Sequence, residues 1–147
     1  MPPPFEVRPD ERISRFVFHS NHVAKRTKTI HPTRLLPQRR RRAEKGRLET
    51  SVCRPDALSD ERFWAICASH FDPTIAPRRA TGRCDALASV VFDVGLSFDP
   101  DGVPFPEHAN IVGWYDQTNE PDERMKHFWM DQAQRMEPHF SFTARPN

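Results

Sequence analysis

Histidines at the expected ends of strands are the residues of this sequence best suited to acid–base chemistry. His19 and His22 follow an alternating segment, and His108 opens the stretch from His108 to Trp114. An imidazole can take or give a proton near neutral pH. Cleaving a phosphodiester without a metal needs a base, an acid and a cation for the developing charge. His19, His22 and His108, with a nearby Lys or Arg as the cation, are therefore candidate catalytic residues if the strand ends meet. The alternative is that these histidines only hydrogen-bond and orient the strand ends.

Other chemistries lack their usual patterns. His19 and His22 have no third metal ligand at a familiar spacing, and His-Glu-x-x-His and Cys-x-x-Cys are both absent. No serine lies in a Gly-x-Ser-x-Gly elbow, and no glycine-rich nucleotide loop occurs. We therefore expect no metal and no cofactor. The cysteines are odd in number and far apart, so we expect buried reduced thiols at Cys53, Cys67 and Cys84.

Positive charge is concentrated in one part of the chain. Residues 24–47 hold ten Lys or Arg and one acid, Glu44, for a net of +9, whereas the whole chain carries only +2. Such a stretch attracts phosphates by counterion release. Apart from His31 it contains no aromatic residue, so base stacking is not indicated. The candidate nucleic-acid-binding residues are Lys25, Arg26, Lys28, Arg34, Arg39, Arg40, Arg41 and Arg42, with Arg54 at the end of the next strand.

Three interpretations of this basic loop remain open. Nucleic acid, more readily RNA or single strands than a defined duplex sequence, is the first. An acidic surface is the second: either that of another protein, which would make the chain an interaction module or partner subunit, or the chain's own acidic remainder. A solvated loop with no partner is the third.

The elements that must position these residues follow from periodicity. Alternation predicts strands over 13–19, 48–54, 96–98, 108–114 and 139–143. In the strand from His108, the side chains of His108 and Asn110 should share one face. Ser59 is a good helix N-cap, and Phe63, Ile66 and Cys67 follow at helical spacing up to His70.

Two further segments have helical patterns. Residues 85–94 favour a helix with Gly95 after its end, although the valines and Phe92 favour a strand. A last helix is expected over 121–136. Its apolar stripe comprises Met125, Phe128, Trp129, Ala133 and Met136.

The length and composition of the chain limit which architectures are possible. The chain has 147 residues, 37% of them hydrophobic, and fifteen prolines. We expect a flexible proline-rich tail over 1–11 and a single α+β domain over 12–147. This domain would hold a small mixed or antiparallel sheet, two or three packed helices and a long basic loop at about 24–47. The chain has no long apolar run and no signal-peptide pattern, which predicts a cytoplasmic protein without membrane contact.

Three short patterns carry a family resemblance. They are Ser51-Val52-Cys53-Arg54, then Leu58-Ser59 to Trp64, then His108-Ala109-Asn110-Ile111-Val112-Gly113-Trp114. Together they resemble a family of short uncharacterised bacterial proteins. The resemblance covers about half of the chain and implies a bacterial setting but no chemistry.

Overall fold

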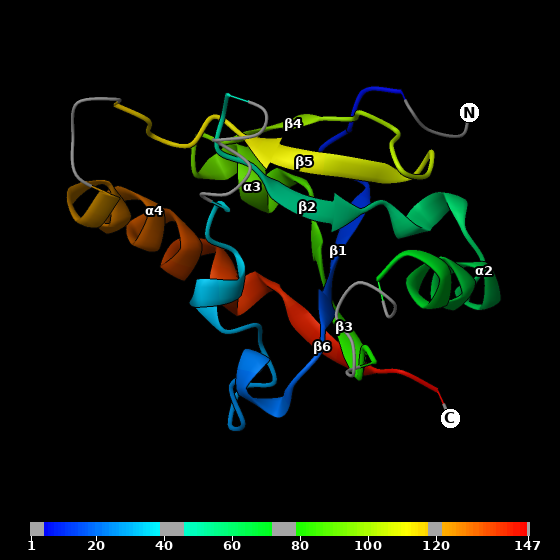
Figure 1. Cartoon of the computed structure of the whole chain (residues 1–147). Helices are drawn as coiled ribbons and strands as arrows, with labels where there is room; N and C mark the ends of the chain where they lie inside the picture. The colour runs from blue at the N-terminus through cyan, green and yellow to red at the C-terminus, as the bar shows by residue number, and fades with distance from the viewer. Residues whose placement is uncertain (1–4, 39–45, 72–78, 118–121, 147) are drawn as a thin grey trace.

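The computed structural model describes residues 5–38, 46–71, 79–117 and 122–146. In these residues the chain forms one six-stranded sheet of order β4-β5-β2-β1-β3-β6, and all neighbours pair antiparallel. Three α-helices accompany the sheet in the same residues (Figure 1). The predicted α+β class is confirmed. The strands are β1 (Arg12–Val17), β2 (Thr50–Cys53), β3 (Gly82–Leu87), β4 (Ser97–Asp99), β5 (His108–Val112) and β6 (Ser141–Ala144), and the helices are α2 (Asp60–Ile66), α3 (Ser89–Asp93) and α4 (Asp122–Met136).

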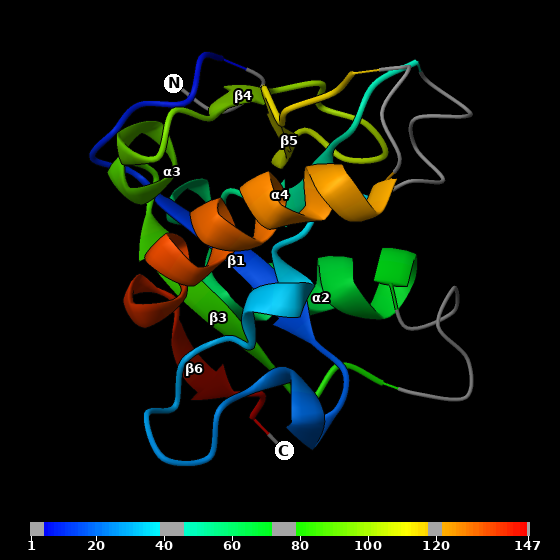
Figure 2. The same cartoon turned by 90° about the vertical axis from the view of Figure 1, so that its left-hand side faces the viewer.

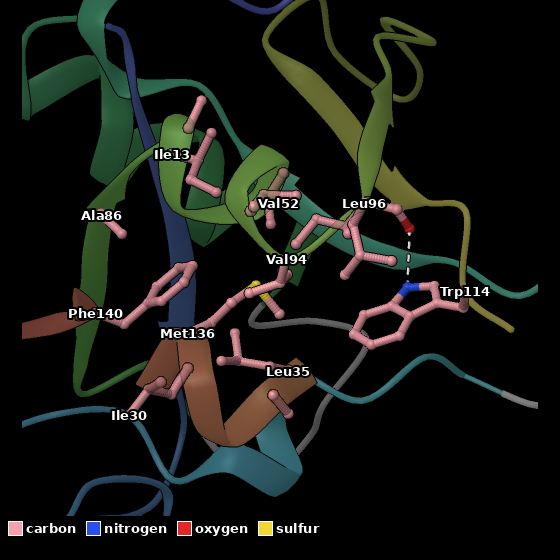
Figure 3. Packing of buried hydrophobic residues seen from close by; sticks show 14 of the residues in the cluster. Ile13, Ile30, Leu35, Val52, Ala86, Val94, Leu96, Trp114, Met136 and Phe140 are labelled. Carbon is pink, nitrogen blue, oxygen red and sulfur yellow. Dashed lines mark hydrogen bonds between the residues drawn. The ribbon is translucent and has the colours of Figure 1, made fainter. Parts of the chain in front are cut away.

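Each face of the sheet packs against its own core, because side chains alternate along a strand. Ile13 of β1 belongs to the larger core, to which α3 and α4 contribute (Figure 2). Figure 3 shows this core, where Met136 and Phe140 from the end of the chain join Ile13. Phe16 of β1 belongs to the smaller core on the α2 side, and its ring centroid lies 5.0 Å from that of Phe63.

The helix predicted from Ser59 is α2, with the expected capping. The Ser59 side chain accepts a hydrogen bond from the Arg62 N–H at 3.1 Å, which satisfies a donor that the helix itself leaves unpaired. Leu58, before the cap, packs against the smaller core to which Phe63 belongs, as a hydrophobic staple requires. After Ile66 the chain continues as a π-helical turn, Cys67–Phe71.

The last predicted helix is α4, whose apolar stripe is buried except at one position. Phe128 is 51% exposed, and its ring lies on that of Tyr115 with centroids 4.5 Å apart. Phe128 and its neighbour Trp129 are about 100° apart around the helix, so both cannot face the sheet equally. Trp129 takes the buried position and donates to the Tyr115 carbonyl oxygen at 2.7 Å.

Residues 85–94, for which the sequence favours a helix, divide between β3 and the short α3. β3 lies inside the sheet and pairs with β1 over its whole length and with β6 on its other side. Backbone bonding to two neighbours outweighs the local helical spacing of these residues. Gly95 does follow the helix as expected: its φ is 84°, and its N–H bonds to the Phe92 carbonyl oxygen at 3.0 Å.

Residues 5–11 differ from the flexible tail that the sequence predicts. Val7 is 4% exposed and belongs to the larger core. The Arg54 guanidinium donates to the backbone oxygens of Phe5 and Glu6 and to both carboxylate oxygens of Glu11. A buried arginine that directly follows β2 thus ties this segment to the sheet, a contact that no local pattern could predict.

Candidate functional site

The described residues of the basic stretch, 24–38 and 46–47, lie at different edges of the sheet, so their charges do not form a single cluster. Near β6, Thr29 bridges to Ser141. At the centre, Leu35 is fully buried in the larger core. Near β4, Arg47 pairs with Asp99. Because β6 and β4 are opposite edges of the sheet, the cations of residues 24–38 and that of Arg47 lie in different places.

Residues 24–29, named the basic turn from here on, contain a run of four exposed residues, 25–28. Backbone bonds close the turn: the Lys28 N–H donates to the Ala24 oxygen at 2.9 Å, and the Ala24 N–H donates to the Thr29 oxygen at 2.8 Å. Lys28 has a φ of 58°, in the left-handed region that allows so tight a reversal. Figure 2 shows the turn in front of β6. Its exposed cations are Lys25, Arg26 and Lys28.

These three cations have no carboxylate partner among the described residues. Many arginines in the body of the sheet, by contrast, are paired: Arg12 with Asp56, Arg47 with Glu49 and Asp99, Arg54 with Glu11, and Arg83 with Asp85. Internal pairing therefore neutralises much of the body of the domain. The basic turn therefore carries three exposed cations that no described carboxylate neutralises.

The other predicted nucleic-acid contacts have different surroundings. Arg34 is half-buried, burial lowers its pKa, and its Nε has no hydrogen-bond partner among the described residues. Arg54 is 5% exposed, and its hydrogen bonds to Glu11 leave it unavailable to a phosphate. This corrects its assignment as a nucleic-acid contact. The run from Arg39 to Arg42 lies outside the described residues.

His19 and His22 use one ring nitrogen each in local backbone contacts. The Nδ1 of His19 accepts from the Asn21 N–H at 3.0 Å, and the Nδ1 of His22 accepts from the Phe18 N–H at 3.2 Å. Their ring centroids are 6.1 Å apart. Both histidines therefore act as strand-end residues that fix the turn after β1.

His108 lies in another part of the sheet. It is opposite Cys53 of β2, which is in turn opposite Ser14, near the beginning of β1. His19 comes five residues after Ser14, which is about 16 Å of extended chain. Figure 1 shows the exit of β1 at the bottom and β5 near the top. The predicted catalytic set of His19, His22 and His108 is therefore not one site. The register places His108 level with the beginning of β1, whereas His19 and His22 follow the end of β1.

A hydrogen-bonded polar cluster does form at the beginning of β5. His108 and Asn110 share a face, as predicted, and both meet Asp101. The Asp101 carboxylate accepts from Asn110 Nδ2 at 2.9 Å and lies 2.7 Å from His108 Nδ1. The pattern Asp99-Pro100-Asp101-Gly102 predicts only a turn, so Asp101 is a residue that the sequence did not indicate.

Cys53 lies beside His108 in this cluster. The Arg54 N–H donates to the Glu107 oxygen at 2.9 Å, so the next pair, Cys53 and His108, is of the non-hydrogen-bonded kind, in which side chains approach closely. The order cysteine, histidine, carboxylate is that of a nucleophilic site. However, burial, with a smaller contribution from Glu107, raises the pKa of Cys53 to about 12. Because only the thiolate is a good nucleophile, this raised pKa does not favour Cys53 as a nucleophile.

Neither the metal-ligating side chains, nor the helices, nor comparisons with known proteins indicate a further site among the described residues. No group of three or more His, Cys, Asp or Glu able to hold a metal ion occurs in the part of the chain that the structure describes. No described helix has the length and apolar character needed to cross a membrane. Comparisons with family models, curated proteins and solved structures give no match for this chain. The resemblance to short bacterial proteins therefore stays a prediction.

Proposed function

We propose that the protein binds nucleic acid, RNA or a single strand, in the cytoplasm, and that the basic turn makes the contact. The observation that carries the proposal is the group of three exposed cations, Lys25, Arg26 and Lys28, without carboxylate partners among the described residues. A phosphate backbone is the polyanion that such a group attracts most generally, because binding releases condensed counterions.

The conformation of the turn favours binding as well as its charge. Two backbone hydrogen bonds between Ala24, Lys28 and Thr29 hold the loop closed. Ile30, which follows directly, is fully buried and anchors the turn in the larger core. A turn that is already ordered loses less conformational entropy when it binds than a free chain does.

Salt dependence measures how many cations take part. For single strands, the slope of log K against log salt concentration is about −0.7 for each phosphate contact. Three contacts give a slope of about −2, whereas all ten cations of residues 24–47 would give about −7. A fluorescein-labelled 12-mer, titrated by anisotropy between 50 and 300 mM KCl, gives this slope directly.

A basic-turn variant tests the assignment of the residues. Its substitutions are Lys25→Ala, Arg26→Ala and Lys28→Asn, the last because asparagine tolerates the left-handed backbone there. We expect an affinity at least about tenfold weaker at 50 mM KCl and a slope reduced by about 2. The matched control removes three exposed cations elsewhere: Arg62→Ala, Arg124→Ala and Lys126→Ala. The proposal is wrong if the wild-type protein does not bind the oligonucleotide even at 50 mM KCl, or if the two variants lose affinity equally.

An acidic protein is the partner that the same experiment can reveal instead. Poly-glutamate of equal charge is added as a competitor for the labelled 12-mer. If it binds as tightly as the oligonucleotide, the basic turn is a protein-docking surface rather than a nucleic-acid interface. Phosphodiester cleavage is not part of the proposal, because His108 lies far from His19 and His22.

A further inference from the structure

An aromatic side chain that is distant in sequence lies beside the basic turn. The Phe142 N–H of β6 donates to the Lys28 backbone oxygen at 2.8 Å, and the Ile30 N–H donates to the Phe140 oxygen at 3.0 Å. Phe142 is opposite Cys84 and packs at the margin of the larger core, the core in which Ile30 is buried. The backbone of the basic turn thus runs beside β6, and Lys28 is the backbone neighbour of Phe142 at this edge of the sheet.

The backbone of β3 holds the Phe142 ring in place. A Cβ atom added at Gly82 would lie 2.3 Å from Cε2 of the Phe142 ring and 2.6 Å from the Thr143 oxygen. The ring therefore lies directly over bare backbone, where only glycine leaves room. Phe142 is nevertheless partly exposed, and no aromatic ring of the described residues stacks on it.

We propose that Phe142 is a stacking platform for an unpaired base of the nucleic acid whose phosphates contact the basic turn. The inference rests on the proposed function and deepens it by naming single-stranded nucleic acid as the ligand class. Stacking on an aromatic ring is open to every base but only when the base is free of a duplex. Cations that follow the backbone beside such a ring are the combination by which proteins bind single strands without sequence preference.

The test separates base contacts from phosphate contacts. Wild-type protein is titrated with a thymidine 12-mer, with an abasic 12-mer that has the same phosphates, and with a 12-base-pair duplex. Stacking of one base is worth about 5-fold to 150-fold in affinity. We expect Phe142→Leu to weaken the thymidine oligomer by at least about 5-fold and to change the abasic oligomer by less than about 2-fold.

Two variants control for folding and for aromaticity. Phe142→Tyr keeps the ring and should bind as the wild type does, even if Phe142→Leu loses stability. Phe128→Leu removes an aromatic side chain that is 51% exposed, lies on Tyr115 and is far from the basic turn in sequence, and it should change neither affinity. A melting curve of each variant shows that it is folded at the assay temperature.

Each outcome decides between the two proposals. If the wild type binds none of the three ligands, the proposed function is lost and the platform with it. If it binds all three equally, or if Phe142→Leu weakens the thymidine and abasic oligomers alike, phosphate binding stands and the platform is refuted. Loss of base-dependent affinity in Phe142→Tyr as well as Phe142→Leu would also refute a role for the ring itself.

Discussion

Replacing Asp101 with alanine should destabilise the protein strongly, because the Asp101 carboxylate accepts hydrogen bonds from two buried side chains. His108 is 4% exposed and Asn110 is fully buried, and Asp101 is their hydrogen-bond partner at 2.7 and 2.9 Å. A buried polar group left without a partner costs about 1–3 kcal/mol. Two such groups, partly relieved by water because the Asp101 side chain is 19% exposed, should cost about 2–4 kcal/mol. At this chain length the melting temperature should fall by about 4–16 °C.

Urea unfolding of Asp101→Ala measures this loss, and Asp99→Ala is the matched control. Asp99 lies two residues earlier and pairs with Arg47, but at the surface, with 37% of its side chain exposed. Surface ion pairs contribute about 0–1 kcal/mol. If Asp101→Ala is no less stable than Asp99→Ala, Asp101 is not the hydrogen-bond partner on which the buried His108 and Asn110 side chains depend.

A second substitution, Asp101→Asn, should make the stability depend on pH with a definite sign. Burial acts to raise the pKa of Asp101, but the hydrogen bonds from His108 and Asn110, the His108 charge and a backbone bond from Val103 together lower it. A carboxyl whose folded pKa is depressed stabilises the fold above its unfolded pKa, about 3.9, and this stability disappears as pH falls through the folded value. The difference in unfolding free energy between wild type and Asp101→Asn should therefore narrow below about pH 4. A difference that stays constant down to pH 2 would contradict the depressed pKa.

Three other substitutions or reactions probe the packing. Cys53, with a pKa raised to about 12 and 1% exposure, should react with iodoacetamide only in denaturant; rapid native labelling, seen by mass spectrometry, would show an open site. Gly82→Ala should lower the unfolding free energy by about 1–3 kcal/mol, because the new Cβ meets the Phe142 ring, and an unchanged melting temperature would contradict that contact. Arg54→Ala leaves the partly buried Glu11 without its cation and should cost about 3 kcal/mol in urea unfolding, the lower end of the range for a buried pair; a loss below about 1 kcal/mol would mean that the pair is solvated.

Sequence patterns predicted the elements whose signals are local. The Ser59 cap and the glycine at position 95 each act within a few residues, and each is found in its expected role. The shared face of His108 and Asn110 likewise follows from strand alternation alone. Such features depend on the backbone within one turn or strand, so one stretch of sequence contains the information.

Interactions across the sheet could not be predicted in the same way. The helical spacing of residues 85–94 is real, but β3 has partners on both sides, and no pattern within the segment reveals them. Arg54 looks like a free cation at a strand end until residues 5–11 are brought beside it. The histidine set failed for the same reason: whether His19 meets His108 depends on the register of β1, β2 and β5.

The distribution of ion pairs separates stability from binding. Cations such as Arg54 and Arg83 are buried beside carboxylates, so removing one leaves an uncompensated charge and costs stability. The cations of the basic turn are exposed and have no carboxylate partner among the described residues, so their removal should change the unfolding free energy by less than about 0.5 kcal/mol. Relief of repulsion among three neighbouring like charges should even favour a small gain. Urea unfolding of the basic-turn variant therefore decides what its loss of binding means. Unchanged stability would assign the loss to the cations, whereas a loss of 2 kcal/mol or more would show that the turn supports the fold.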